Sequence, residues 1–143
     1  LTEIVSGGVP RDGIPALDRP PARPASETEL PAREPVLVVE LEGAPARAWA
    51  LRHLMWHEIV NEEIAGRPVT VTWCPLCNSA IVFDGRAAGR ELSFGVTGKL
   101  RRSDLVMYDR ETESWWQQIE GLALAGELAG VRLETIPSWV ESF

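Results

Sequence analysis

The residues best suited to chemistry are the two cysteines, Cys74 and Cys77, which are the only cysteines of the chain. Two intervening residues bring both sulfurs to one side of a tight turn, where they can share a metal ion or close a disulfide. A structural zinc site requires four ligands, and the sequence offers no third cysteine. The spacing therefore predicts a site, and leaves open metal binding, a redox-active or structural disulfide, and inert buried thiols.

The two histidines are the natural candidates for further ligands. His53 and His57 are four residues apart and share one face of a helix or of a strand. Together with the cysteine pair they would complete a tetrahedral set, and Met55 or Met107 could serve as a soft ligand if the metal were copper. We therefore predict a copper or zinc site formed by Cys74, Cys77 and His57, with Met107, Asp104 and His53 as possible additional ligands.

Two other uses of the same sulfurs stay open. The segment Trp73–Cys77 is superficially similar to the W-C-x-x-C of thioredoxin-like oxidoreductases, where a helix N-terminus activates the first thiol. Residues 78–84 favour a strand over a helix, so a thioredoxin fold is not expected. In a thiol-disulfide redox protein, Cys74 would be the more exposed nucleophile and Cys77 the resolving thiol. The third alternative is a non-catalytic interaction module stapled by a disulfide.

Other catalytic plans have little support in the sequence. There is no G-x-S-x-G, G-x-G-x-x-G or G-x-x-x-x-G-K-[ST] motif, so neither a serine hydrolase elbow nor a nucleotide phosphate cradle is indicated. Asp104, Asp109 and Glu111 flank a short apolar run and could form an acid–base set. Acids at strand ends are nevertheless usually solvated turn formers, which is what we expect of these three.

Composition narrows the partners. The 143 residues carry 14 Lys plus Arg against 21 Asp plus Glu, a net charge of -7. Nucleic acid is therefore not an expected partner, because phosphate-backbone affinity comes mainly from cationic side chains. No stretch approaches the roughly 20 apolar residues of a membrane span. A chain of this size can bury one continuous core.

The elements that would position the cysteines are mainly strands. Residues 1–35 hold seven of the eleven prolines and predict an extended arm without helix or central strand over 18–35. A single domain is expected over 36–143. Helical spacing of apolar residues begins at Leu51, with Gly66 as a plausible stop. Short strands are expected elsewhere, at 36–41, 47–51, 68–74, 80–83, 90–96, 104–108, 115–119 and 131–135, and a last helix could begin at Pro137. This pattern predicts an α+β fold, dominated by an antiparallel β-sheet or a partly open barrel, with one central short helix.

Six blocks of sequence resemble the prokaryotic family catalogued as domain of unknown function 3179. They agree with it in order and in spacing, and they cover nearly the whole chain: Val5–Gly8, Asp12–Leu17, Trp56–Asn61, Cys74–Ala80, Phe94–Gly98 and Ser103–Arg110. The family name carries no reaction. Members are mostly exported or membrane-tethered, so the resemblance implies an extracytoplasmic protein (periplasmic, secreted or membrane-tethered), with a protein partner possible.

The resemblance also implies which positions matter. The family pattern carries over Trp56, His57, Glu58, Asn61, Cys74, Pro75, Cys77, Ser103, Asp104, Met107, Tyr108 and Asp109. It does not carry over His53 or Met55, which favours a site of two cysteines and one histidine completed by water, a methionine, an acid or a partner. Trp73 stands where the family has Tyr. Relatives continue past Phe143, so we expect a further ligand or lid downstream of this sequence.

Overall fold

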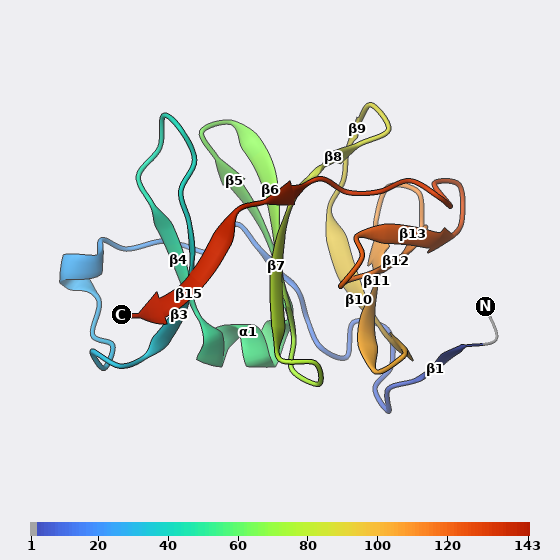
Figure 1. The fold of residues 1–143 in the computed structure, drawn as a ribbon, viewed down its shortest axis with the longest axis horizontal. Helices are drawn as coiled ribbons and strands as arrows, with labels where there is room; N and C mark the ends of the chain where they lie inside the picture. The colour runs from blue at the N-terminus through green and yellow to red at the C-terminus, as the bar shows by residue number, and fades with distance from the viewer. Residues whose placement is uncertain (1–2) are drawn as a thin grey trace.

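The computed structural model describes residues 3–143, which form three larger sheets, arranged as successive layers (Figure 1), and one small two-stranded sheet. The β10 sheet contains, in spatial order, β1 (Ile4–Ser6), β10 (Phe94–Arg101), β11 (Asp104–Asp109), β12 (Trp115–Gln117) and β13 (Leu122–Ala125). The central sheet contains β14 (Thr135–Ile136), β7 (Ser79–Asp84), β6 (Arg67–Cys74), β5 (Ile59–Ile64) and β2 (Leu17–Asp18). The β3 sheet contains β15 (Ser138–Ser142), β3 (Pro35–Val39) and β4 (Arg47–Ala50).

The remaining elements are small. The only α-helix among residues 3–143, α1 (Leu51–His57), follows β4 directly, and η1 (Ala25–Glu27) is one turn of 3-10 helix. A two-stranded ribbon, β8 (Arg86–Ala87) and β9 (Arg90–Glu91), leads into β10. None of these helices is long and apolar enough to cross a membrane. The fold is thus α+β and mostly antiparallel, as predicted, and its sheets are stacked without closing into a barrel.

The central sheet is covered on both faces, because successive side chains of a strand point to opposite sides. In β6, Val69, Val71 and Trp73 pack into one core together with the β3 sheet and Leu54 of α1. Cys74 instead joins Ile59 of β5 in a second core, formed with the β10 sheet. The cysteine site therefore lies at the end of β6, in the layer between the central sheet and the β10 sheet.

Two of the predicted helical segments are strands. The helix ends at His57, because Glu58 adopts a left-handed backbone conformation (φ 60°), and residues 59–64 form β5 in register with β6. The β-branched Ile59 and Val60 favour this pairing over a continued helix. Residues 138–142 form β15 on β3 instead of a last helix after Pro137. Of the predicted strand 131–135, only Thr135 belongs to a strand.

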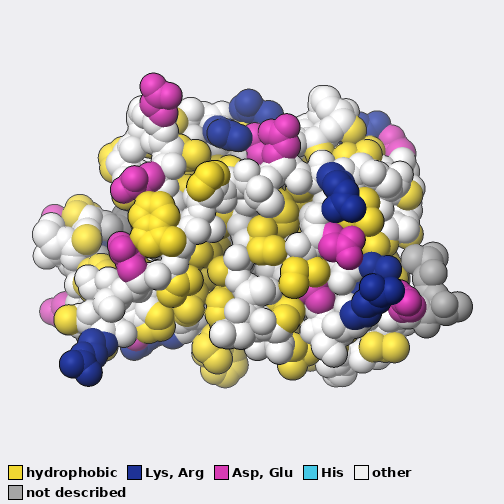
Figure 2. All heavy atoms as spheres, in the orientation of Figure 1, with side chains coloured by type: hydrophobic (Ala, Val, Ile, Leu, Met, Phe, Trp, Pro, Cys, Tyr) yellow, Lys and Arg dark blue, Asp and Glu magenta, His cyan; other side chains and the backbone are white. Residues whose placement is uncertain are grey.

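Charged side chains of both signs are interspersed over the face shown in Figure 2, and apolar side chains reach the surface between β7 and β15. No extended basic surface appears on that face. The visible face therefore gives no reason to change the expectation, made from the sequence, that nucleic acid is not a partner. That expectation rests on the net charge of -7.

The N-terminal arm is extended and is held at defined points. Within 18–35 its regular structure is limited to the end of β2, η1 and the first residue of β3, Pro35, and most of the segment is irregular as the prolines predict. Nearer the N-terminus, the Arg11 guanidinium lies 3.7 Å from the centre of the Tyr108 ring, and Tyr108 Oη donates a 2.7 Å hydrogen bond to Asp12. The Tyr108 ring thereby anchors residues 11–12 against β11.

Gly95 gives the Tyr108 ring its space. A Cβ atom at Gly95, which is paired with Tyr108 across β10 and β11, would lie 2.6 Å from the ring. We expect Gly95→Ala to lower the free energy of unfolding by about 2 kcal/mol, because overpacking of this kind forces the ring to move. Urea unfolding measures the loss. The same substitution made in a Tyr108→Ala background should cost much less, and an equal loss in both backgrounds would contradict the explanation.

Candidate metal centre

Two hairpin turns meet at the cysteine site. Cys74 is the last residue of β6, and residues 75–78 form the turn to β7, closed by Asn78 in a left-handed conformation (φ 47°). Facing it is the two-residue turn between β10 and β11, in which both Arg102 and Ser103 have positive φ (53° and 64°). Positive φ at both central residues is characteristic of the type I′ turn that matches strand twist. This turn delivers Asp104, the first residue of β11, to the cysteine pair.

Cys74, Cys77 and Asp104 form one cluster. Their candidate ligand atoms, two sulfurs and one carboxylate oxygen, all lie within 4.8 Å of one another. The Cys77 thiol donates to Asp104 Oδ1 at 3.2 Å, and Cys74 Sγ lies 3.9 Å from the carbonyl oxygen of Ser103. The second carboxylate oxygen of Asp104 accepts the main-chain N–H of Ile119 at 3.0 Å. The carboxylate is therefore held in place by a bond that does not involve the cysteines.

The cluster is buried and lacks a cationic side chain. Cys74 and Asp104 are 1% and 3% exposed, and Cys77 is half-buried. None of the ion pairs found among residues 3–143 involves Asp104. Burial raises the pKa of the Cys77 thiol to about 12, and its hydrogen bonds to Cys74 and Asp104 act in the same direction against that of Ser79. In the absence of a cation the arrangement thus favours a protonated Cys77.

A second row of polar groups supports the site from the central layer. Ser79 Oγ lies 3.5 Å from Cys77 Sγ and 3.2 Å from Gln118 Oε1. The fully buried Gln118 donates to Thr72 Oγ1 at 3.0 Å. Sequence analysis did not identify Ser79, Gln118 or Thr72. Gln118 lies 41 positions after Cys77 in the sequence (118 minus 77), and no local pattern marks it.

The histidines are not part of this cluster. His57 Nδ1 lies 2.8 Å from the carbonyl oxygen of Pro15, a contact that ties α1 to the N-terminal arm. His53 is exposed on α1, where it lines a groove along that arm. Of the residues singled out in the sequence, the structure brings together Cys74, Cys77 and Asp104, and places His57 and His53 elsewhere.

Other candidate residues are placed as follows. Met107 is fully buried in the same apolar core as Cys74, and Met55 is 59% exposed. The predicted order of thiol exposure is wrong, because Cys74 is the more buried of the two. Asp104 and Asp109 are also not the solvated turn formers that we expected. Asp109 is fully buried and accepts the Trp116 indole N–H at 2.8 Å.

Glu58 is the other unusual ionisable group near this end of the molecule. It caps α1 with a left-handed backbone, and its carbonyl oxygen accepts the main-chain N–H of Trp73. Burial raises the pKa of the Glu58 carboxyl to about 7. The folded protein therefore keeps a proton on this carboxyl at pH values at which the unfolded chain has lost it.

This shift predicts a pH dependence of stability. A raised folded pKa makes the contribution of Glu58 fully present below the unfolded value, and it is lost as the pH rises toward about 7. Glu58→Gln should remove that loss. The free energy of unfolding of the variant, relative to that of the wild type, should therefore be about 1 kcal/mol higher at pH 8 than at pH 4, after allowance for partial exposure. Urea unfolding at both pH values measures the difference. A constant difference between the two proteins would contradict the assignment.

Comparison with known proteins gives a family and no activity. No curated protein and no solved structure matches the chain. The family model described as "Protein of unknown function (DUF3179)" matches residues 11–143, which include the arm contacts, both hairpin turns of the cysteine site and β15. Five of the six sequence blocks lie within the matched residues, and the first, Val5–Gly8, lies before them. The family resemblance is thereby confirmed, and the chain belongs to the DUF3179 family.

Proposed function

We propose that this protein binds a metal ion through Cys74, Cys77 and Asp104, and that zinc is the ion for which these donors are best suited. The observation that carries the proposal is the convergence of two sulfurs and one carboxylate oxygen within 4.8 Å. Zinc accepts both thiolate and carboxylate ligands, whereas Cu(I) prefers an all-sulfur environment. Relative to the sequence-based hypothesis, Asp104 takes the position assigned to His57, and copper becomes the second choice.

Charge supports the same proposal. The buried Asp104 carboxylate lies beside two cysteines and has no basic side chain paired to it among residues 3–143. A divalent cation supplies the missing positive charge and is bound by the deprotonated ligands, so binding releases protons from the thiols. Three protein ligands would leave a fourth position for water or another molecule, as in zinc sites that are not purely structural.

Thiol-disulfide chemistry is the second candidate, favoured by the closeness of two free thiols. In this alternative, oxidation of the pair to a disulfide transfers two electrons to a disulfide partner, and two protons leave the thiols. The attacking species must be a thiolate. Burial and the neighbouring carboxylate both act against a thiolate at Cys77, which makes this alternative the weaker one. The resemblance to exported proteins leads us to propose an extracytoplasmic location, which cell fractionation of the native host tests.

Metal analysis of the purified protein tests the proposal directly. Protein isolated without chelator or immobilised metal, or loaded with zinc after reduction, should hold about one zinc ion per chain. Replacing zinc by Co²⁺ should give thiolate-to-cobalt charge-transfer absorption, which reports sulfur ligation. A protein that takes up neither ion under reducing conditions would contradict metal binding. If its thiols also interconverted with a disulfide at a defined potential, the redox alternative would take its place.

A further inference from the structure

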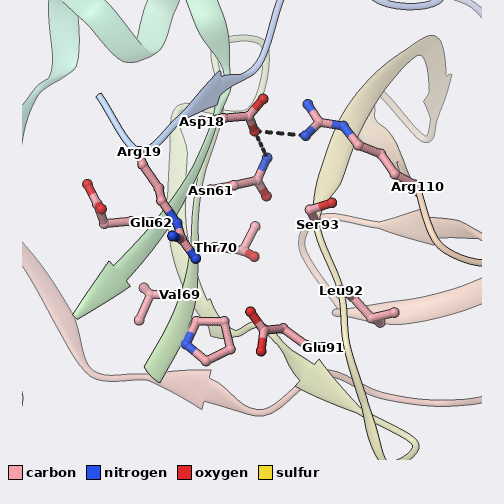
Figure 3. A pocket seen from close by; sticks show the side chains of 11 residues that line it. Asp18, Arg19, Asn61, Glu62, Val69, Thr70, Glu91, Leu92, Ser93 and Arg110 are labelled. Carbon is pink, nitrogen blue, oxygen red and sulfur yellow. Dashed lines mark hydrogen bonds and ion pairs between the residues drawn. The ribbon is translucent and has the colours of Figure 1, made fainter. Parts of the chain in front are cut away.

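A pocket lined by charged side chains of both signs lies apart from the cysteine cluster. It has a volume of about 280 Å³ and lies between the central sheet and the segment that joins β9 to β10 (Figure 3). Its walls include none of the residues of the cysteine cluster. The residues that matter below are Asp18, Arg19, Asn61, Thr70, Glu91 and Arg110.

One wall of the pocket is fixed by hydrogen bonds. The Asn61 side chain donates to the main-chain oxygen of Phe94 at 2.8 Å and accepts the N–H of Phe94 at 2.8 Å. It also donates to Asp18 at 2.9 Å, and Arg110 pairs with the same carboxylate oxygen at 2.8 Å. Although burial acts to raise it, these two partners hold the pKa of Asp18 below its ordinary value. This wall is therefore preorganised, and it contains a formed ion pair between Asp18 and Arg110.

Other groups at the pocket have unused hydrogen-bonding capacity. Thr70 is 1% exposed, and its side chain points into the pocket in Figure 3, yet its hydroxyl makes no hydrogen bond to residues 3–143. The Glu91 carboxylate, at the opposite end of the pocket in that view, has no partner in the same range. Arg19 and Arg110 each use one terminal nitrogen, toward Glu63 and Asp18, and keep further N–H groups.

We propose that this pocket binds a small zwitterion of the α-amino acid class with an aliphatic side chain. The free N–H groups of Arg19 and Arg110 match a carboxylate. The Glu91 carboxylate matches an ammonium group, and the Thr70 hydroxyl, which faces the pocket, gives a partner of either polarity. Pro68, which lies two residues before Thr70 and therefore on the same face of β6, supplies an apolar wall for the side chain. A singly charged ligand would leave either the Glu91 carboxylate or the remaining N–H groups of Arg19 and Arg110 without a partner. This proposal does not depend on metal binding.

Three related probes test the need for both charges. L-valine should bind the full chain saturably in isothermal titration calorimetry. N-acetyl-L-valine, which lacks the ammonium group, and L-valine amide, which lacks the carboxylate, should each bind at least about tenfold more weakly, because each leaves a charged wall unpaired. Equal binding of either derivative would overturn the zwitterion proposal, as would the absence of saturable valine binding.

Variants locate the binding in this pocket. Glu91→Gln and Thr70→Val should each weaken valine binding by about tenfold, since a hydrogen bond to a charged ligand is lost. Thr70→Ser keeps the hydroxyl and should retain binding, which separates loss of the hydroxyl from damage to the fold. Glu40→Gln removes an exposed carboxylate just beyond β3 and should leave binding unchanged. Wild-type affinity in both Glu91→Gln and Thr70→Val would overturn the assignment.

Discussion

Asp104→Asn is expected to lower zinc affinity by more than about 100-fold, since even losses outside the coordination sphere cost 10- to 100-fold. Asparagine has nearly the same shape and keeps an oxygen that can accept the Ile119 N–H, but it lacks the negative charge that a cation requires. Cys74→Ser and Cys77→Ser should each abolish stoichiometric zinc. Competition with a chromophoric chelator measures the affinity of each variant.

His57→Ala separates this expectation from the sequence-based hypothesis. His57 contacts Pro15 and is not part of the cluster, so its removal should leave zinc affinity near that of the wild type. Glu120→Gln, which alters an exposed carboxylate next to Ile119, is the matched control for loss of one negative charge near the site. If His57→Ala lost zinc while Asp104→Asn kept it, the third ligand would be the histidine and our assignment would be wrong.

The sequence predicted the cysteine pair of this site, and it named Asp104 only as a possible additional ligand, with His57 as the expected third one. A C-x-x-C is a local feature, whose geometry follows from two intervening residues. The approach of Asp104 to the cysteines depends on how the central sheet packs against the β10 sheet, because Asp104 lies 27 residues after Cys77 in the chain. The turn that aims it contains Arg102 and Ser103, and neither is the Asn-Gly type of residue that signals a type I′ turn. The sequence therefore indicated Asp104 only as a possible additional ligand and did not distinguish it from a solvated acid at a strand end.

The helix and strand errors have the same origin. Leu51, Leu54, Met55 and Ile59 have helical spacing, but only Leu54 and Ile59 are fully buried, and they belong to different cores. The spacing arose from a short helix followed by a strand. After Pro137, the chain could extend along β3 because a neighbouring edge was available, which local propensity does not reveal. The prediction of the fold class used only composition and the spacing of the strands, and it was correct because neither depends on the exact ends of each element.

Asn61 should be among the most important single residues for stability. The family resemblance marked it without a reason, and the structure supplies one, because its side chain joins β5 to the main chain of Phe94 at the start of β10. Asn61→Ala would leave the N–H and the C=O of a fully buried residue unpaired. At about 1–3 kcal/mol for each unsatisfied group, we expect a loss of about 3 kcal/mol in the free energy of unfolding. The melting temperature should fall by about 10 °C.

The size of this effect follows from where the bonds lie. Asn61 makes the same pair of bonds to Phe94 that a neighbouring strand would make, and so replaces strand pairing between two sheets that are otherwise joined by side-chain packing and by side-chain hydrogen bonds such as that of Gln118 to Thr72. Glu63→Gln, two residues along β5 and exposed, is the matched control and should change stability by less than about 0.5 kcal/mol. Thermal and urea unfolding of both variants measure the difference. If Asn61→Ala were as stable as Glu63→Gln, water would have replaced both bonds, and the bonds to Phe94 would not be what holds the two sheets together.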